Sequence, residues 1–282
     1  MTHPAPPRWP SWWRRGGRGR GGGVPAPLLV PALLGVAFLV LPLLGLLVRA
    51  PWSDLGPQLA RPGVGEALRL SLVSATLATV VSLLLGVPLA WVLARSQLRG
   101  RSVLRALVTV PLVLPPVVGG VALFLVLGRQ GIIGRWLFEA TGLSLPFTTA
   151  AVVVAETFVA MPFLVISVEG ALRAADARFE DAAATLGADR WTTFRRVTLP
   201  LVAPGIAAGA VLCWARALGE FGATITFAGN FPGTTQTMPL AVYLTLQRDP
   251  EAAIVLSLVL LGVSLATLLL LRDRWLGRGA VT

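Results

Sequence analysis

The chain has no lysine, a single histidine and a single cysteine, and these shortages exclude several kinds of site. Without lysine, the phosphate-binding loop GxxxxGK(S/T) cannot occur. The lone Cys213 permits neither a disulfide within the chain nor a cysteine-based metal site. The only histidine, His3, lies near the N-terminus, so the body of the protein has no candidate for histidine-based catalysis. We therefore expect a chain that holds no metal or cofactor and does not itself hydrolyse ATP.

Charged residues are also scarce, at 13% of the 282 positions, and they leave long uncharged runs. Leu70–Ala94, Ala106–Gly128 and Ala252–Leu271 contain no charge at all. Because roughly 20 apolar residues in a helix cross a hydrocarbon core of about 30 Å, runs of this length predict an all-α integral membrane protein. The six predicted spans are 27–48, 67–94, 106–128, 149–168, 201–228 and 251–271, with approximate edges.

The placement of the arginines predicts the orientation of these spans. If the N-terminus is cytoplasmic, the inside segments hold 17 arginines and the outside loops and their margins hold 6. Such an excess on one side satisfies the positive-inside rule, so we expect both termini in the cytoplasm. Nucleic-acid binding needs a concentrated basic patch on a soluble surface, whereas these arginines are distributed between hydrophobic spans. The basic charge therefore indicates orientation in a lipid bilayer and no nucleic-acid partner.

The loops and ends divide the chain further. Two outside loops are distinctive: 129–148 is expected to form an external cap, and 229–250 contains a short apolar segment typical of an interfacial or re-entrant helix. The predicted parts are a disordered Arg- and Gly-rich arm (1–24), a first span with its external loop (25–64), a core (65–271) and a cytoplasmic tail (272–282).

One cytoplasmic loop, 169–200, is polar and charged although the surrounding chain is hydrophobic. Alanines and acidic residues predict a helix that is interrupted at Gly187, where a backbone without a Cβ suits a sharp turn or a close contact. Asp189 follows and is placed to cap a second helix, and Pro200 begins the next span. The pattern alone also fits a plain amphipathic connector on the membrane surface.

This loop resembles the signature of the permease subunits of binding-protein-dependent ABC importers, which reads EAA, three residues, Gly, nine residues and I-x-L-P. Asp181-Ala182-Ala183 stands at EAA, Gly187 at the glycine and Val197-Thr198-Leu199-Pro200 at I-x-L-P. Aspartate for glutamate and valine for isoleucine are the departures. The resemblance implies an ABC importer type I transmembrane domain whose loop docks on a separate ATPase. The implied coupling residues are Phe179, Glu180, Asp181, Ala182, Ala183, Gly187, Trp191, Phe194, Leu199 and Pro200, the aromatic ones as anchors.

The fifth predicted span contains charges that are costly within a bilayer. Arg216 and Glu220 are four residues apart and share a helix face, and Glu156 in the fourth span is a further intramembrane charge. The sequence leaves open which carboxylate pairs with Arg216. It also leaves open whether the arginine only neutralises a neighbour or lies near the path of an anion. The candidates for a translocation path or gate are Arg216, Glu220, Gly222, Thr224, Thr226 and Glu156.

The run ALGEFGATITFAGNFPGTTQTMPLAVY at 217–243 resembles the molybdate-type permeases and, less closely, their sulfate-type relatives. The resemblance implies that the chain forms a homodimer in the bacterial cytoplasmic membrane. It also implies two ATPase subunits that bind ATP and Mg, and a periplasmic or extracellular substrate-binding protein. The implied cargo is molybdate or tungstate.

Three alternatives remain at this stage. The first is a sulfate/thiosulfate-type permease of the same family. The second is an ion-coupled secondary carrier with Glu156 and Glu220 as proton sites. The third is a membrane enzyme, which would need clustered acidic residues or histidines near an interface, and such clusters are missing from the predicted spans.

Overall fold

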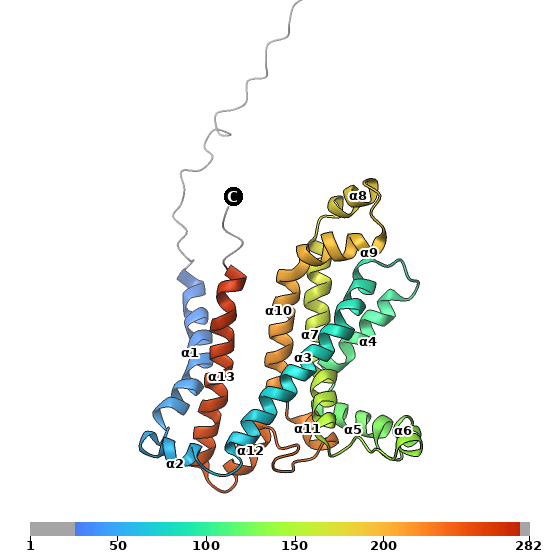
Figure 1. The fold of residues 1–282 in the computed structure, drawn as a ribbon. Helices are drawn as coiled ribbons and strands as arrows, with labels where there is room; N and C mark the ends of the chain where they lie inside the picture. The colour runs from blue at the N-terminus through green and yellow to red at the C-terminus, as the bar shows by residue number, and fades with distance from the viewer. Residues whose placement is uncertain (1–25, 277–282) are drawn as a thin grey trace, which may run out of the picture. The chain divides into compact units, whose positions relative to one another are not determined.

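The computed structural model describes the backbone of residues 26–276, all of whose regular elements are helical (Figure 1). The arm predicted at 1–24 and the last residues of the predicted tail, 277–282, lie outside the described residues. The elements are α1 (Ala26–Val48), η2 (Trp52–Asp54), α2 (Leu55–Leu59), α3 (Val64–Arg95), α4 (Arg101–Val113), α5 (Pro116–Leu127), α6 (Gly134–Thr141), α7 (Thr149–Ala174), α8 (Arg178–Thr185), α9 (Arg190–Thr193), a π-helical turn η3 (Phe194–Thr198), α10 (Leu199–Leu218), α11 (Gly222–Phe227), α12 (Met238–Leu246) and α13 (Pro250–Leu276).

The chain divides into two compact units, Met1–Arg49 and Ala50–Thr282. The described part of the first unit is α1, a continuous helix of 23 residues that is long enough to span a bilayer. Its large apolar side chains are exposed, as Leu33 and Phe38 illustrate at 66% and 77%. A helix with apolar side chains on its outer surface is suited to contact lipid or another apolar surface.

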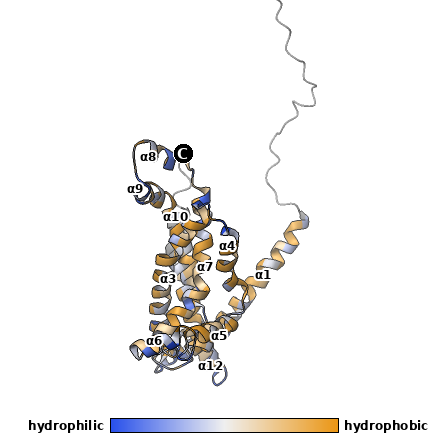
Figure 2. Ribbon diagram, turned by 90° about the vertical axis from the view of Figure 1, so that its right-hand side faces the viewer, coloured by the Kyte–Doolittle hydropathy of each residue, from blue (hydrophilic) through white to orange (hydrophobic). Residues whose placement is uncertain are grey.

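The centre of the second unit is a bundle of α3, α7 and α10, whose facing side chains form the largest buried core. Hydrophobic residues run along these three helices, and hydrophilic residues gather at α8 and α6 (Figure 2). Small residues let the helices approach closely: a Cβ on Gly86 of α3 would lie 3.2 Å from Leu164 and Val165 of α7. Close packing at small residues is the usual way in which membrane helices associate.

Five described helices have the length and composition of membrane spans. They are Pro27–Val48, Val64–Arg95, Thr149–Ala174, Arg190–Leu218 and Pro250–Thr267. A sixth is obtained if the bent pair α4 and α5 is counted as one span. The prediction of an all-α membrane protein with about six spans is therefore confirmed, with two corrections to the spans themselves.

The first correction concerns the third span, which the sequence predicted as one helix over 106–128. The structure has α4 and α5 instead, bent by 116° at the break between them. Leu114 and Pro115 are extended there, with ψ of 134° and 131°. Proline disfavours helical backbone in the residue before it and has no N–H to donate, so the Pro115-Pro116 pair ends the first helix.

The second correction concerns the fifth span, predicted at 201–228. Its helix begins earlier, at Arg190, and ends at Leu218. Gly219 to Phe221 interrupt the helix, and α11 follows as a separate segment of 6 residues. The candidate path residues from Glu220 to Thr226 therefore lie in the break and in α11, outside a continuous span.

Short helices gather at one end of the bundle, opposite to α8 and α9 (Figure 1). The predicted cap at 129–148 contains α6, and the short apolar segment predicted within 229–250 is α12. The aromatic rings of Phe147 and Phe231 contact edge to face between these loops, with centroids 6.0 Å apart. The second unit thus has one end built from loops and short helices and another end that carries the signature loop.

Candidate coupling segment and charged residues of the bundle

The signature loop forms two helices joined by a turn at Gly187, as the sequence predicted. Gly187 has φ of +81°, a backbone conformation that side chains with a Cβ rarely adopt. Asp189 caps α9, because its carboxylate accepts a hydrogen bond of 3.1 Å from the backbone N–H of Thr192. Hydrogen bonds from the hydroxyl and the backbone of Thr192 hold the pKa of Asp189 below its ordinary value. The residues that define the turn are therefore those that the sequence pattern indicated.

The helix does not stop at Pro200 but continues from α9 through η3 into α10. In η3 the N–H of Leu199 donates to the carbonyl of Phe194, five residues earlier, which is π-helical spacing. Pro200 has no N–H, so the backbone ladder must change just before it. The signature loop is thus joined to α10 by an unbroken helical path with a locally wider turn.

The candidate coupling residues differ in their exposure to solvent. Phe179 and Trp191 are 57% and 65% exposed, so they are free to serve as anchors for a partner. Leu186, which the sequence analysis did not single out, is 88% exposed at the end of α8. Phe194 is half-buried and packs edge to face on Trp91 of α3, with ring centroids 4.9 Å apart. Phe194 therefore packs within this chain and is less available than the other two rings.

The acidic pair at the start of α8 divides into an outward and an inward residue. Asp181, at the signature position, is exposed. Glu180 turns toward the bundle and forms an ion pair of 3.1 Å with Arg95, the last residue of α3. It also accepts a hydrogen bond of 3.0 Å from the hydroxyl of Thr198 in η3. Of the two carboxylates, that of Glu180 is therefore bound to other residues of this chain, and that of Asp181 faces outward.

A second charged cluster at the same end joins α4 to α7. Glu169, whose side chain is only 9% exposed, receives Arg105 of α4 at 2.5 Å and Arg173 at 2.8 Å. The spacing of Glu169 and Arg173 is a sequence signal for a pair on one helix face. No such signal exists for Arg105, because it lies 64 positions away in the chain. Sequence reasoning missed this cluster.

Replacing Glu169 with alanine is expected to destabilise the bundle. The two guanidinium groups would lose their shared carboxylate, at a cost of about 1–2 kcal/mol, less than for fully buried pairs because both arginines are partly exposed. The midpoint of thermal unfolding of the detergent-solubilised protein should fall by several degrees. The control is Glu139→Ala, which removes an exposed ion pair within α6 and should leave the midpoint unchanged. Equal midpoints for the two variants would contradict the expectation.

The charges within the fifth span pair with each other. The guanidinium of Arg216 lies 2.7 Å from the carboxylate of Glu220, which settles which of the two carboxylates it contacts. Glu220 also accepts a hydrogen bond of 2.8 Å from the N–H of Ala223, so it bridges the break between α10 and α11. Its side chain is 1% exposed, whereas that of Arg216 is 27% exposed. The arginine therefore has one face free while its charge is neutralised.

Glu156 lies between α7 and α3, close enough to Glu220 for the two carboxyl groups to interact electrostatically. It is fully buried and accepts a hydrogen bond of 2.8 Å from the hydroxyl of Ser74. One α-helical turn away, Ser71 accepts a hydrogen bond of 2.7 Å from the N–H of Met238, at the start of α12. The structure thus places Glu156 in contact with a serine and not with Arg216.

The remaining candidate residues lie where α11 crosses the start of α5. A Cβ on Gly222 would lie 2.9 Å from Pro116, so the glycine is needed for this close approach. The hydroxyl of Thr226 donates to the carbonyl of Gly222, 2.9 Å away within its own helix. Thr224 is fully buried, and its hydroxyl has no hydrogen-bond partner among the described residues. Of these side chains, that of Thr224 has unused hydrogen-bonding capacity.

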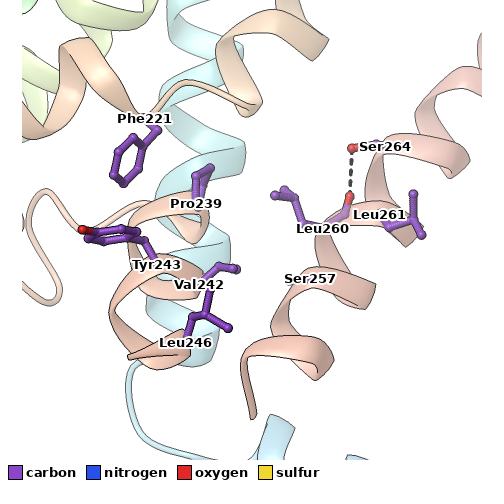
Figure 3. A pocket seen from close by; sticks show the side chains of 9 residues that line it. All are labelled: Phe221, Pro239, Val242, Tyr243, Leu246, Ser257, Leu260, Leu261 and Ser264. Carbon is purple, nitrogen blue, oxygen red and sulfur yellow. Dashed lines mark hydrogen bonds between the residues drawn. The ribbon is translucent and has the colours of Figure 1, made fainter. Parts of the chain in front are cut away.

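An open groove of about 510 Å³ lies between α12 and α13 (Figure 3). Its lining is almost wholly apolar, with Phe221, Val242 and Leu260 on its walls. The serines that reach it bond to their own helix, since Ser264 donates to the carbonyl of Leu260 at 2.8 Å. With few free hydrogen-bond donors, this groove suits hydrocarbon rather than a charged solute. In the part of the chain that the structure describes, no three His, Cys, Asp or Glu side chains are arranged to hold a metal ion.

These features define a class: a helical membrane subunit that has a two-helix segment at one end of its bundle and neutralised charges inside it. Comparison with known proteins agrees. Residues 86–280 match the family described as binding-protein-dependent transport system inner membrane component. The chain belongs to this family, and it is a multi-pass subunit of an ATP-driven importer rather than an ATPase itself. A transport system of this kind includes a binding protein and an ATPase.

Three relatives illustrate the likeness. The molybdenum transport system permease protein ModB of Mycobacterium bovis is 52% identical over 86% of this chain and 91% of the relative. The sulfate transport system permease protein CysT of Escherichia coli is 36% identical over 82% of this chain and 84% of the relative. A bacterial alginate ABC transporter, solved in complex with an alginate pentasaccharide-bound periplasmic protein, has a chain with a TM-score of 0.65 at 18% identity, covering 89% of this chain and 94% of that one.

Family membership confirms the predicted family, fold class and membrane location. It also removes the two alternatives from other classes, the ion-coupled secondary carrier and the membrane enzyme. The sulfate-type permease is the alternative that stays within the family. The roles of the individual coupling and path residues remain predictions.

Proposed function

We propose that the chain is the permease of a molybdate importer, with tungstate as the closely similar alternative cargo. The observation that carries the proposal is the 52% identity with a molybdenum permease over 86% of the chain. The sulfate permease is 36% identical over a similar share, which favours the molybdenum branch. Molybdate and sulfate are both tetrahedral dianions, so a permease of this family faces the same charge problem with either.

We propose that α8, the Gly187 turn and α9 dock on the ATPase, which binds ATP and Mg on behalf of the complex. The exposure of Phe179, Trp191 and Leu186 at one end of the bundle supports this, because large apolar side chains in water mark a contact surface. Arg95 and Arg105 lie at the same end as the signature loop. This arrangement supports a cytoplasmic position for that end and both termini in the cytoplasm.

We propose that the working unit contains two copies of this chain, two copies of the ATPase and one external binding protein. In one copy, the groove between α12 and α13 is almost wholly apolar and offers a dianion few hydrogen-bond donors. A dianion crossing a membrane needs hydrogen-bond donors and opposite charge around it. A passage between two copies would supply them from both chains.

We propose that the anion passes beside the break between α10 and α11. Arg216 is about a quarter exposed there, so a solute can approach its guanidinium although Glu220 neutralises it. The unused hydroxyl of Thr224 lies in the adjoining helix, close to Gly222 and Thr226 in sequence. Glu156 is a buried carboxyl group on α7 that interacts electrostatically with Glu220, so it would adjoin the proposed path without contacting Arg216.

The test uses proteoliposomes that contain this chain and its ATPase. ATP hydrolysis is followed as binding protein is added, either empty or loaded with molybdate, tungstate or sulfate. We expect stimulation several-fold above the empty protein by the molybdate- or tungstate-loaded form alone. Equal or greater stimulation by the sulfate-loaded form would overturn the cargo and leave the importer intact. Absence of stimulation by every form, in an assembled complex, would contradict the proposed function.

A further inference from the structure

The helix α8 is attached to the rest of the chain by two short connections. Residues 175–177 join it to α7, and residues 186–189, with the left-handed Gly187, join it to α9. Each connection is three or four residues long and lies outside the helices. Backbone at such positions is where hinge motion is usually absorbed. By its covalent connections alone, α8 would be free to pivot relative to the bundle.

A partly buried side-chain cluster holds α8 against that pivoting. The carboxylate oxygen Oε1 of Glu180 receives the guanidinium of Arg95 at 3.1 Å and the hydroxyl of Thr198 at 3.0 Å. The same guanidinium nitrogen lies 3.4 Å from the carbonyl oxygen of Ala175, at the end of α7. The side chains of Arg95 and Glu180 are 22% and 21% exposed, and Thr198 is fully buried. We call Arg95, Glu180 and Thr198 the latch.

The latch connects α8 to α3, a helix that is distant from α8 in the sequence. Arg95 is the last residue of α3, and 85 positions separate it from Glu180. Among the described residues, the ion pair between Arg95 and Glu180 joins α3 to α8. Thr198 lies in η3, directly before α10. The Glu180 carboxylate therefore connects α8 to the end of α3 and to the turn before α10, and Arg95 adds a contact with the end of α7.

We propose that the latch makes α8 a rigid extension of the bundle, so that a displacement of α8 by the ATPase moves α3, α7 and α10 together. The inference rests on the proposed docking of α8 and adds residues that position it. Charge-assisted hydrogen bonds that are largely shielded from water are stronger and more directional than exposed ion pairs. Arg95, Glu180 and Thr198 are positioning residues, because they hold the segment in place and touch neither ATP nor the transported anion.

The test compares Arg95→Ala, Glu180→Gln and the charge-reversed double variant Arg95→Glu/Glu180→Arg in the assembled complex. The measured quantity is anion imported per ATP hydrolysed, with binding protein and anion in excess. We expect each single variant to lower this ratio at least five-fold while ATP hydrolysis stays within two-fold of the wild type. The double variant should recover at least half of the wild-type ratio, since the reversed pair can form the same contact. Arg135→Ala, which breaks an exposed ion pair in α6, is the matched control and should match the wild type.

A second measurement separates the latch from a general loss of structure. Hydrogen exchange of the backbone amides of α8 should accelerate at least ten-fold in the single variants and that of α7 should not change. An unchanged transport ratio would overturn the inference, and so would a joint loss of ATP hydrolysis and transport, which would assign the pair to docking. The ratio is taken with whichever anion the wild type imports. Failure of the molybdate proposal is therefore seen in the wild type alone, and failure of the latch is seen only in the variants.

Discussion

Replacing Gly187 with tryptophan is expected to lower anion uptake at least ten-fold while the chain remains in the membrane. Two physical effects act together. The backbone of Gly187 has φ of +81°, and a residue with a Cβ is disfavoured there by about 1–2 kcal/mol. Apart from its two neighbours in the sequence, no described residue lies within 4 Å of a Cβ at this position, so the indole would project outward, into the surface that we propose for the ATPase. Uptake into proteoliposomes and co-purification of the ATPase are the measurements.

Two further substitutions at Gly187 separate the backbone effect from the steric one. Asparagine tolerates left-handed backbone, whereas alanine does not, and both are far smaller than tryptophan. If the turn geometry is decisive, Gly187→Asn should keep most of the uptake and Gly187→Ala should lose several-fold. If close approach of the ATPase is decisive, Gly187→Asn and Gly187→Ala should both lose uptake, as Gly187→Trp does. Wild-type uptake in Gly187→Trp would remove this loop from the proposed coupling surface.

The parts of the fold that the sequence predicted correctly are those with strong local causes. Long uncharged runs became helical, as spanning helices or, at 106–128, as a bent pair, because a bilayer leaves the backbone few other ways to satisfy its hydrogen bonds. The turn at Gly187 and the cap at Asp189 follow from residues that are adjacent in the chain. The spacing of four residues made Glu220 one of two candidate partners for Arg216, and the structure selects it although Glu220 lies just past the end of α10.

The parts that the sequence did not predict depend on contacts between distant segments. Proline is tolerated inside membrane helices, as Pro88 and Pro162 show, so Pro115 and Pro116 could not be recognised as a break by composition. The bend is stabilised where α5 packs on α11: a Cβ on Gly120 would lie 2.7 Å from the carbonyl oxygen of Ala223. Such packing joins residues about a hundred positions apart, and no pattern in a single sequence reports it.

The same limit applies to the charged residues at the end of the bundle that carries α8. The resemblance implied that Glu180 and Asp181 are both coupling residues. The structure separates them, because Glu180 contacts Arg95 and Asp181 stays exposed. Only the fold brings the end of α3 to the start of α8, so the inward role of Glu180 could not be inferred from residue type.

Replacing Arg216 with alanine is expected to have the largest effect among the charged residues within the spans. Its partner Glu220 is 1% exposed, and a buried carboxylate that loses its cation costs about 3–5 kcal/mol. We expect a lower yield of assembled complex, a fall in the thermal midpoint and uptake at least ten-fold below the wild type. The measurements are thermal unfolding of the purified complex and initial uptake rates normalised to assembled protein. A wild-type midpoint in this variant would contradict a structural role for the pair.

The double variant Arg216→Met/Glu220→Gln distinguishes neutralisation from contact with the anion. It removes both charges and leaves an unbranched, though shorter, side chain at position 216, and the equally long glutamine can still accept the hydrogen bond from the N–H of Ala223. We expect the thermal midpoint to recover, because no buried charge is left unpaired. Uptake should stay at least five-fold below that of the wild type. In the proposed path the exposed side of the Arg216 guanidinium attracts the passing dianion, and the double variant lacks that group. Full recovery of uptake would instead limit Arg216 to neutralising Glu220, and the path would then depend on hydrogen-bond donors such as Thr224.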